Sequence, residues 1–372
     1  MRAKKVMLIA IAVLVAACAI MTLFAPKDVF LDKENRPASS APVFSFNTLF
    51  EGKLTEDTED YLVDRFPGRE DLMSLYALIN KAMGKTEVNG VYLCSDGYYI
   101  EEPAKDKDYS KLVNAVNELK GKNPSVRFMM MTPPTAVSVL SDKLPYGAYG
   151  GSQREDYNNI RNSLDPDIDF IDCLPALEEA ATKWQVFYRT DHHWTTYGAF
   201  AAYSELCREE GFKVPDIKDY KIEEISDSFL GTVDAKVSDP FAVADKIYAV
   251  KEPVPVTVEY QGHTESSLYN AEYLIQRDKY SYFLDNINDR ITITQNDPLP
   301  DAKGKTLLVI KDSYANCFVP FLTENYEKII VLDTRYYMYG ASSVIESENV
   351  TDCLILYNLN TADSDAGLAG IY

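Results

Sequence analysis

The chain has only three histidines, and two of them, His192 and His193, are adjacent. Asp191 precedes this pair on a loop expected between an alternating stretch at residues 185–188 and a helix. A carboxylate at such a position can hold an imidazole in one tautomer, which makes the imidazole a general base. Asp191 and His193 are therefore candidates for a catalytic pair.

Two other interpretations of this cluster remain open. Asp191 can instead cap the following helix while the histidines fill space. Aspartate and histidine are also good metal ligands, but no third and fourth ligand with recognisable spacing accompanies them, and His263 is isolated. We therefore expect no metal site.

A general base needs a nucleophile, and Ser313 stands where a parallel sheet would present one. Residues 306–310 are expected to form an apolar strand, and Asp312 and Ser313 lie between this strand and a helix. Free N–H groups and the dipole at the helix start can stabilise an oxyanion there. Alone, either residue would be an ordinary helix cap. Together with Asp191 and His193, they complete a catalytic triad in the chain order Asp, His, Ser.

Four further side chains are candidates for contact with an oxyanion or a substrate: Asn316, Arg335, Trp194 and Tyr336. Asn316 falls in the first turn after Ser313, and Arg335 follows the next expected strand. Trp194 and Tyr336 could stack on sugar rings. Ordinary explanations compete with these roles: a helix-surface amide for Asn316, an ion pair with a neighbouring acid for Arg335, and core packing for Trp194.

The elements that must position these residues follow an alternating pattern from residue 109 onward. Short apolar strands separated by helices are expected at residues 126–131, 168–171, 306–310, 329–332 and 353–357. Continuous apolar strands joined by helices indicate a parallel sheet covered on both faces. Between residues 215 and 300 this succession of strands and helices is replaced by short runs of alternating apolar and polar residues, which predict a partly β insertion. The expected fold class is α/β, with a doubly wound parallel sheet.

The N-terminal third has a different organisation. A linker rich in proline, serine and charge is expected at residues 27–42. Residues 46–83 have apolar side chains at helical spacing, interrupted by Pro67 and Gly68, which predicts two short helices. Residues 88–100 alternate around a Ser-Asp-Gly turn, as in a hairpin. The expected boundaries are a membrane segment at 1–26, a linker, helices and hairpin at 27–100, and the α/β domain at 101–372, with its insertion at about 215–300.

A basic head, Arg2, Lys4 and Lys5, opens the chain and is followed by 20 uncharged residues at 6–25. Such a run can cross a bilayer, and the positive-inside rule then exports everything that follows. We favour an uncleaved anchor in the cell membrane, because the apolar run continues past Cys18, where a lipoprotein normally turns polar. A lipoprotein modified at Cys18 and a secreted protein with a cleaved signal peptide are the alternatives.

The exported part is strongly acidic. The whole chain has 37 basic and 57 acidic residues, a net charge of -20. Without its first 27 residues the chain keeps 33 basic and all 57 acidic residues, a net charge of -24. This charge argues against nucleic acid as a partner. The 26 tyrosines, against 16 phenylalanines and 2 tryptophans, favour a glycan partner, and the cysteines form no C-x-x-C pair that would indicate zinc.

The Asp-His-His-Trp motif of residues 191–194 and the Lys-Asp-Ser-Tyr motif of residues 311–314 resemble those of the bacterial DHHW family. That family is related to the SGNH hydrolase-like domain of alginate O-acetyltransferases. Supporting motifs lie at residues 64–69, 89–92 and 333–337. The resemblance implies that Ser313 is the nucleophile, His193 the base and Asp191 its orienting carboxylate. One departure is Lys311, which stands where the wider superfamily has glycine. A second is that the Gly and Asn motifs that complete the oxyanion hole in ordinary SGNH enzymes are not identifiable here.

The resemblance also implies a function. We expect an O-acetyltransferase or carbohydrate esterase, with no cofactor, that moves an acetyl group to or from a cell-surface polysaccharide through an acyl-enzyme. A chain with one membrane segment cannot export an acyl donor, so a multi-spanning membrane acyltransferase is the expected partner. The alternative is a non-catalytic surface protein that binds or scaffolds glycans with the same fold.

Overall fold

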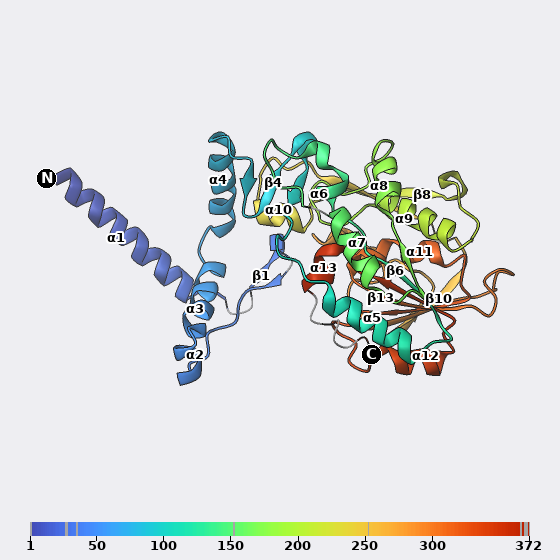
Figure 1. The fold of residues 1–372 in the computed structure, drawn as a ribbon. Helices are drawn as coiled ribbons and strands as arrows, with labels where there is room; N and C mark the ends of the chain where they lie inside the picture. Colours follow the sequence, from blue (N-terminus) through green and yellow to red (C-terminus); the bar gives the residue numbers. More distant parts are fainter. Residues whose placement is uncertain are drawn as a thin grey trace. The chain divides into compact units, whose positions relative to one another are not determined.

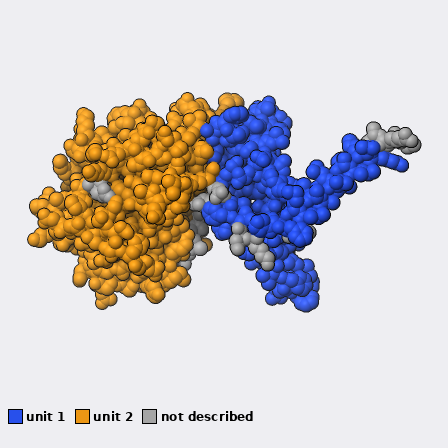
Figure 2. Space-filling view, turned by 180° about the vertical axis from the view of Figure 1, so that it is seen from behind, with its two compact units in different colours: residues 1–89, 234–242 blue, residues 90–233, 243–372 orange. Residues whose placement is uncertain are grey.

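The computed structural model describes residues 2–26, 29–34, 36–151, 153–251, 253–364, 367 and 371. Residues 27, 28 and 372, which fall at expected segment boundaries, lie outside these ranges. The chain folds as two compact units, coloured separately in Figure 2. Unit 1 comprises Met1–Asn89 and Asp234–Ala242, and unit 2 comprises Gly90–Val233 and Val243–Tyr372. The expected boundaries at residues 26 and 100 stay a prediction.

Unit 1 is built mainly from helices. Helix α1 is long and apolar enough between Lys4 and Thr22 to cross a membrane. The Pro-Gly break expected within residues 46–83 separates α3 from α4, and a short additional helix, α2, precedes them. The elements are α1 (Arg2–Leu23), β1 (Phe30–Leu31), β2 (Arg36–Pro37), α2 (Phe46–Phe50), α3 (Lys53–Asp64), α4 (Arg69–Ala82) and β3 (Glu87–Val88), with part of α10 (Thr232–Val237).

Asp64, at the end of α3, organises unit 1. The Arg36 guanidinium donates two hydrogen bonds of 2.8 Å to its carboxylate, and Ser39 donates two more from its backbone N–H and its hydroxyl. Burial opposes ionisation of Asp64, but the hydrogen bonds from Arg36 and Ser39 outweigh it and lower its pKa. Arg69 pairs with Glu34 at 2.5 Å. The motif at residues 64–69 therefore ties α3 and α4 to the segment that follows α1.

The core of unit 2 is an eight-stranded sheet in the order β11-β10-β12-β14-β13-β15-β6-β7. Its parallel part is β14 (Lys328–Leu332), β13 (Thr306–Lys311), β15 (Asp352–Leu356), β6 (Arg127–Met131) and β7 (Ile168–Ile171). The central strands are continuous apolar runs, and Leu307–Ile310 have no exposed surface. This is the pattern of strands covered on both faces, so the expected α/β fold class is confirmed.

The stretch expected to be a partly β insertion supplies antiparallel strands to this same sheet. β12 (Arg290–Gln295) pairs with β14, β10 (Val256–Tyr260) with β12, and β11 (His263–Glu265) with β10. A separate ribbon is formed by β8 (Ile222–Phe229) and β9 (Asp245–Val250). The alternating pattern of the stretch predicted strands, and the structure adds that three of them extend the main sheet.

Helices cover both faces of the sheet (Figure 1). On one face α5 packs beside α12 and α13, and on the other α9 packs beside α8 and α11. The expected hairpin consists of β4 (Val91–Leu93) and β5 (Tyr99–Glu101). The helices are α5 (Ser110–Lys122), α6 (Ala136–Val139), α7 (Gln153–Ser163), α8 (Leu174–Ala181), α9 (Thr196–Glu209), α11 (Val319–Leu322), α12 (Ala341–Glu348) and α13 (Leu359–Ser364).

Candidate active site

Asp191, His193 and Ser313 come together in one hydrogen-bonded line. His193 Nδ1 lies 2.5 Å from Asp191 Oδ1, and His193 Nε2 lies 2.7 Å from Ser313 Oγ. Both distances are within reach of proton transfer. Asp191 and His193 are buried, whereas Ser313 is only partly buried. The three residues therefore have the geometry of a nucleophile, a base and an orienting carboxylate.

The loop that carries Asp191 and His193 is closed by an isolated β-bridge between Phe187 and Trp194. Asp191 Oδ1 also accepts the backbone N–H of His193, at 3.0 Å. Helix α9 is capped instead by Thr195, whose hydroxyl oxygen accepts the N–H of Gly198. The alternative that Asp191 serves as the cap of this helix is therefore wrong.

The other carboxylate oxygen of Asp191 is held by Thr232, which donates from its backbone N–H at 2.9 Å and from its hydroxyl at 3.1 Å. Gly231 makes this approach possible, because a Cβ there would lie 2.3 Å from the Cβ of Asp191. Burial opposes ionisation of Asp191, but His193, His192 and the Thr232 N–H outweigh it, so its pKa lies well below the usual value.

The imidazole of His193 is neutral at neutral pH. Burial and the neighbouring His192 lower its pKa to about 4, against the opposing effect of Asp191. Ionised Asp191 therefore accepts a hydrogen bond from the Nδ1–H group of His193, and Nε2 is left with a lone pair directed at Ser313. This is the protonation state in which His193 can remove the proton of the serine hydroxyl.

Ser313 opens a short 3-10 helix, η7 (Ser313–Cys317), directly after β13. Asp312 is its cap: one carboxylate oxygen accepts the Tyr314 N–H at 2.9 Å, and the other accepts the backbone N–H of Asn358 at 2.8 Å. Burial raises the pKa of Asp312 despite these hydrogen bonds. The capping role proposed for Asp312 or Ser313 thus falls to Asp312, which leaves the Ser313 hydroxyl to His193.

Tyr280 is a site residue that the sequence did not reveal. It lies in the 3-10 helix η6 (Lys279–Tyr282), within the stretch expected to be an insertion. Its ring stacks on the imidazole of His193 with a centroid separation of 3.8 Å and an interplanar angle of 11°. Its hydroxyl donates to the backbone oxygen of Ser313 at 3.0 Å. Tyr280 therefore positions base and nucleophile together, but one tyrosine among 26 gave no signal.

The expectation that Trp194 stacks on a substrate is wrong. Its side chain has no exposed surface, its ring packs parallel to that of Phe318, and its indole N–H donates to the backbone oxygen of Tyr314 at 2.9 Å. The tryptophan instead connects the loop of His193 to η7, because its indole N–H donates to Tyr314, the residue after Ser313.

The remaining candidates lie at the end of β14 and in η7. Arg335 pairs with Asp333, through hydrogen bonds of 2.8 and 2.6 Å, and its guanidinium lies over the ring of Tyr336, which is exposed. Asn316 is buried and accepts a hydrogen bond of 2.9 Å from the ammonium of Lys311. The structure therefore bears out the ion-pair explanation for Arg335 and gives Asn316 a specific partner.

Asp191, His192 and His193 also form a cluster whose potential ligand atoms lie within 4.8 Å of one another. Two of these side chains hydrogen-bond each other through His193 Nδ1, and His192 Nδ1 lies 2.7 Å from the hydroxyl of Thr232. A metal at this cluster would have to replace these hydrogen bonds, so the arrangement fits acid–base chemistry better.

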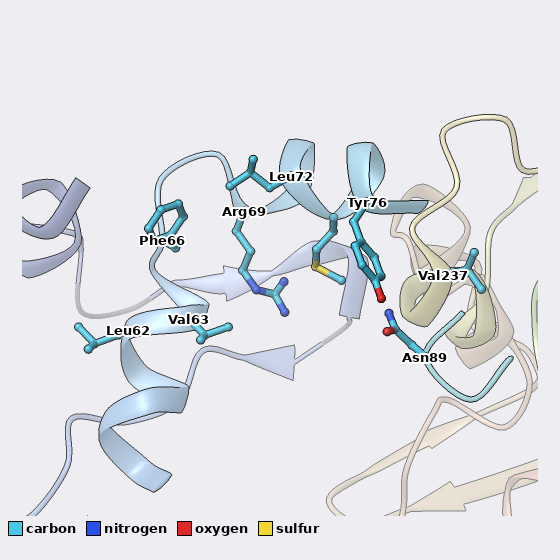
Figure 3. Close-up of a pocket in the computed structure, with 9 residues that line it drawn as sticks. Leu62, Val63, Phe66, Arg69, Leu72, Tyr76, Asn89 and Val237 are labelled. Atoms are coloured by element: carbon cyan, nitrogen blue, oxygen red, sulfur yellow. The ribbon is translucent and has the colours of Figure 1, made fainter. Parts of the chain in front are cut away.

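A groove of about 430 Å³ lies in unit 1 and contains none of these candidates. Side chains of α3 and α4 face it, together with Asn89 and Val237 (Figure 3). Most of its lining is apolar: Leu62, Val63, Phe66, Leu72, Met73, Tyr76 and Val237, with Arg69 and Asn89. It offers no arrangement of nucleophile and base.

The fold and the site define an α/β protein with an Asp-His-Ser set at the carboxyl edge of its parallel strands. Residues 77–332 match the model of the DHHW protein family, and the chain belongs to this family. The resemblance noted in the sequence is thereby confirmed.

Solved structures share this fold. A DHHW family protein from Eubacterium siraeum is 27% identical and superposes with a TM-score of 0.66, over 77% of this chain and 95% of that one. Bacillus cereus PatB1, solved with a sulfonyl adduct, is 23% identical, with a TM-score of 0.62 over 76% of this chain and 98% of its own.

A curated relative is also similar in sequence. The probable alginate O-acetylase AlgJ of Azotobacter vinelandii is 26% identical over 166 residues. The match covers 42% of this chain and 42% of the relative, so the chain spans less than half of that protein's length.

Proposed function

We propose that this protein is a serine-dependent O-acyl-transfer enzyme that moves an acetyl group to or from a cell-surface polysaccharide. The observation that carries the proposal is the pair of contacts made by His193, with Nε2 at 2.7 Å from Ser313 Oγ and Nδ1 at 2.5 Å from Asp191. The acetyl group and the polysaccharide are supported by the similarity to a probable alginate O-acetylase.

The reaction proceeds in two halves. His193 Nε2 takes the hydroxyl proton while Ser313 Oγ attacks the ester carbonyl carbon. The bond from that carbon to the donor oxygen then breaks, and the departing alkoxide takes the proton from Nε2, which leaves an acyl-serine. In the second half an acceptor hydroxyl gives its proton to Nε2 and attacks the acyl carbon. Ser313 Oγ leaves and recovers the proton. Asp191 stays ionised throughout and stabilises the imidazolium.

The acceptor decides between the two proposed activities: a sugar hydroxyl makes the protein an O-acetyltransferase, and water makes it a carbohydrate esterase. We favour transfer, because the related AlgJ is described as an O-acetylase. No cofactor is needed for either half-reaction.

We place the protein in the cell membrane, held by α1, with the catalytic unit outside the cytoplasm. This is supported by the length and apolar character of α1 and by the basic residues before its apolar run. One membrane segment provides no route for an acyl donor across the bilayer. A multi-spanning membrane acyltransferase is therefore the proposed partner that supplies the acyl group.

The test is turnover of a chromogenic acetyl ester by the full-length chain in detergent micelles, with and without a glycan acceptor. We expect Ser313→Ala to abolish ester turnover and acetyl transfer while leaving the circular dichroism spectrum unchanged. Phenylmethylsulfonyl fluoride should modify the wild-type chain but not Ser313→Ala, since a sulfonyl adduct is known in the structurally similar PatB1. A wild-type chain that binds glycan but has no Ser313-dependent turnover would favour the non-catalytic alternative.

A further inference from the structure

Lys311 is a lysine beside the nucleophile with almost no exposed surface, 2%. Its ammonium nitrogen lies 2.9 Å from Asn316 Oδ1 and 3.5 Å from Asp333 Oδ2. None of the proton transfers proposed above uses it. Burying an ammonium opposes folding unless partners compensate for the lost hydration. The contacts of Lys311 with Asn316 and Asp333 therefore need an explanation.

The contact with Lys311 fixes which way the Asn316 amide points. A lysine side chain has only donors, so the atom of Asn316 that faces it must be the carbonyl oxygen. The amide nitrogen is therefore turned away from Lys311. Within the described ranges of the chain, this nitrogen donates no hydrogen bond to protein.

Asn316 follows Ser313 by three residues in the 3-10 helix η7. Side chains three residues apart eclipse one another in a 3-10 helix. Asn316 and Ser313 thus lie on one face of η7, and an amide N–H of Asn316 is a donor on the face of the nucleophile. Such a donor is what a developing oxyanion requires.

An ion pair with Asp333 also holds Lys311 in place. Asp333 has no exposed surface and lies between Lys311 and Arg335, which donates two hydrogen bonds to it. Burial opposes ionisation of Asp333, but Arg335 and Lys311 outweigh it and lower its pKa. Burial also lowers the pKa of Lys311, and Asp333 opposes this effect. The chain of contacts runs from the partly exposed Arg335 to Asn316, beside the nucleophile.

We propose that Lys311 is a positioning residue, which holds the Asn316 amide so that its nitrogen donates to the oxyanion formed on an ester at Ser313. Asp333 and Arg335 hold Lys311 in turn. The proposal rests on the proposed acyl-transfer function.

The test is a double-mutant cycle on the full-length chain in detergent micelles, with a chromogenic acetyl ester. We expect Asn316→Ala to lower kcat on the order of 100-fold, the usual effect of losing one oxyanion donor. Lys311→Met should lower kcat by about 10-fold or more with KM unchanged, since it leaves the amide free to rotate. In the Asn316→Ala background, Lys311→Met should have no further effect, because it acts through Asn316.

Two controls keep the test decisive. Lys120 is also buried and donates to the backbone oxygen of Val126 at 3.0 Å, far along the chain from the site residues; Lys120→Met should keep the wild-type kcat. Asn316→Asp keeps the shape of the side chain and an acceptor for Lys311 but removes the N–H, so it should lose kcat while remaining folded. If Lys311→Met does not fold, Asn316→Asp alone tests whether the amide N–H of Asn316 is needed for turnover.

The inference is overturned if Lys311→Met lowers kcat by the same factor in the wild-type and the Asn316→Ala backgrounds. It is also overturned if Asn316→Asp keeps the wild-type kcat. Ser313→Ala is measured alongside them. Turnover that survives Ser313→Ala overturns the proposed function itself, whereas turnover that needs Ser313 but neither Lys311 nor Asn316 overturns only the role given to this pair.

Discussion

In the proposed mechanism His193 is the general base, and its surroundings suit it to this role in two ways. Asp191 fixes the tautomer from one side, while burial and His192 keep the imidazole unprotonated. Tyr280 covers one face of the ring and also bonds the backbone of Ser313. Asp191 and His192 are sequence neighbours of His193, whereas Tyr280 and Ser313 come from distant parts of the chain, so the environment of this histidine combines local and long-range contacts.

The lowered pKa of His193 predicts an unusual acid limb. Protonation of Nε2 removes the acceptor that Ser313 needs, so turnover is lost as the pH falls through the pKa of this histidine. With that pKa at about 4, kcat/KM for an acetyl ester should decline only in acid and reach half of its neutral-pH value at about pH 4. The measurement is a pH–rate profile, with circular dichroism at each pH as the control for folding. A midpoint near 6.5, the value of an exposed histidine, would contradict the described environment.

At the level of elements, the close approach of helix α9 to the extended segment at Val186 depends on a glycine. A Cβ at Gly198 would lie 2.4 Å from the backbone oxygen of Val186 and 3.0 Å from the Cβ of Trp194. Val186 and Trp194 flank the loop of Asp191 and His193, which the bridge between Phe187 and Trp194 closes. The first turn of α9 therefore has a close-packing requirement that a helix-forming residue cannot satisfy.

Gly198→Ala should consequently reverse the usual effect of alanine in a helix. Alanine in place of a helical glycine normally stabilises by about 0.5–1 kcal/mol, but the overlap here should destabilise the protein by about 1–3 kcal/mol. Gly121 in α5 is the matched control, because its added Cβ would meet nothing within 4 Å. Urea unfolding should separate the two: a lower midpoint for Gly198→Ala and an equal or higher one for Gly121→Ala. A stabilised Gly198→Ala would show that α9 packs less closely.

For the molecule as a whole, charge is unevenly distributed along the chain. The basic residues at the start lie before the apolar run, and the part after this run is strongly acidic. The part after residue 27 has a net charge of -24, so an anionic polymer would be repelled in the absence of local cations. Arg335 is such a cation beside the site, but Asp333 already pairs with it. A neutral or weakly charged glycan therefore suits the surface better.

An uncleaved anchor predicts the state of Cys18 in cells. The protein extracted from membranes should retain residues 1–26 and carry an unmodified Cys18, because the apolar helix continues to Leu23. Mass spectrometry of the N-terminal peptides measures both. Cys18→Ala should leave the amount of membrane-bound protein unchanged. A mature chain that begins at a lipid-modified Cys18 would establish the lipoprotein alternative. A soluble protein that lacks residues 1–26 would establish the secreted alternative.

The amino-acid sequence by itself determined the fold class, the strands of the parallel sheet and the motifs that contain Asp191, His193 and Ser313, because buried strands and clustered polar residues in loops leave local patterns. The tertiary structure decided what depends on residues distant along the chain. It brought Tyr280 onto His193, buried Trp194 in the core, joined β10 and β12 to the main sheet and set Asp333 against Lys311. These contacts depend on packing between elements, which no local spacing records.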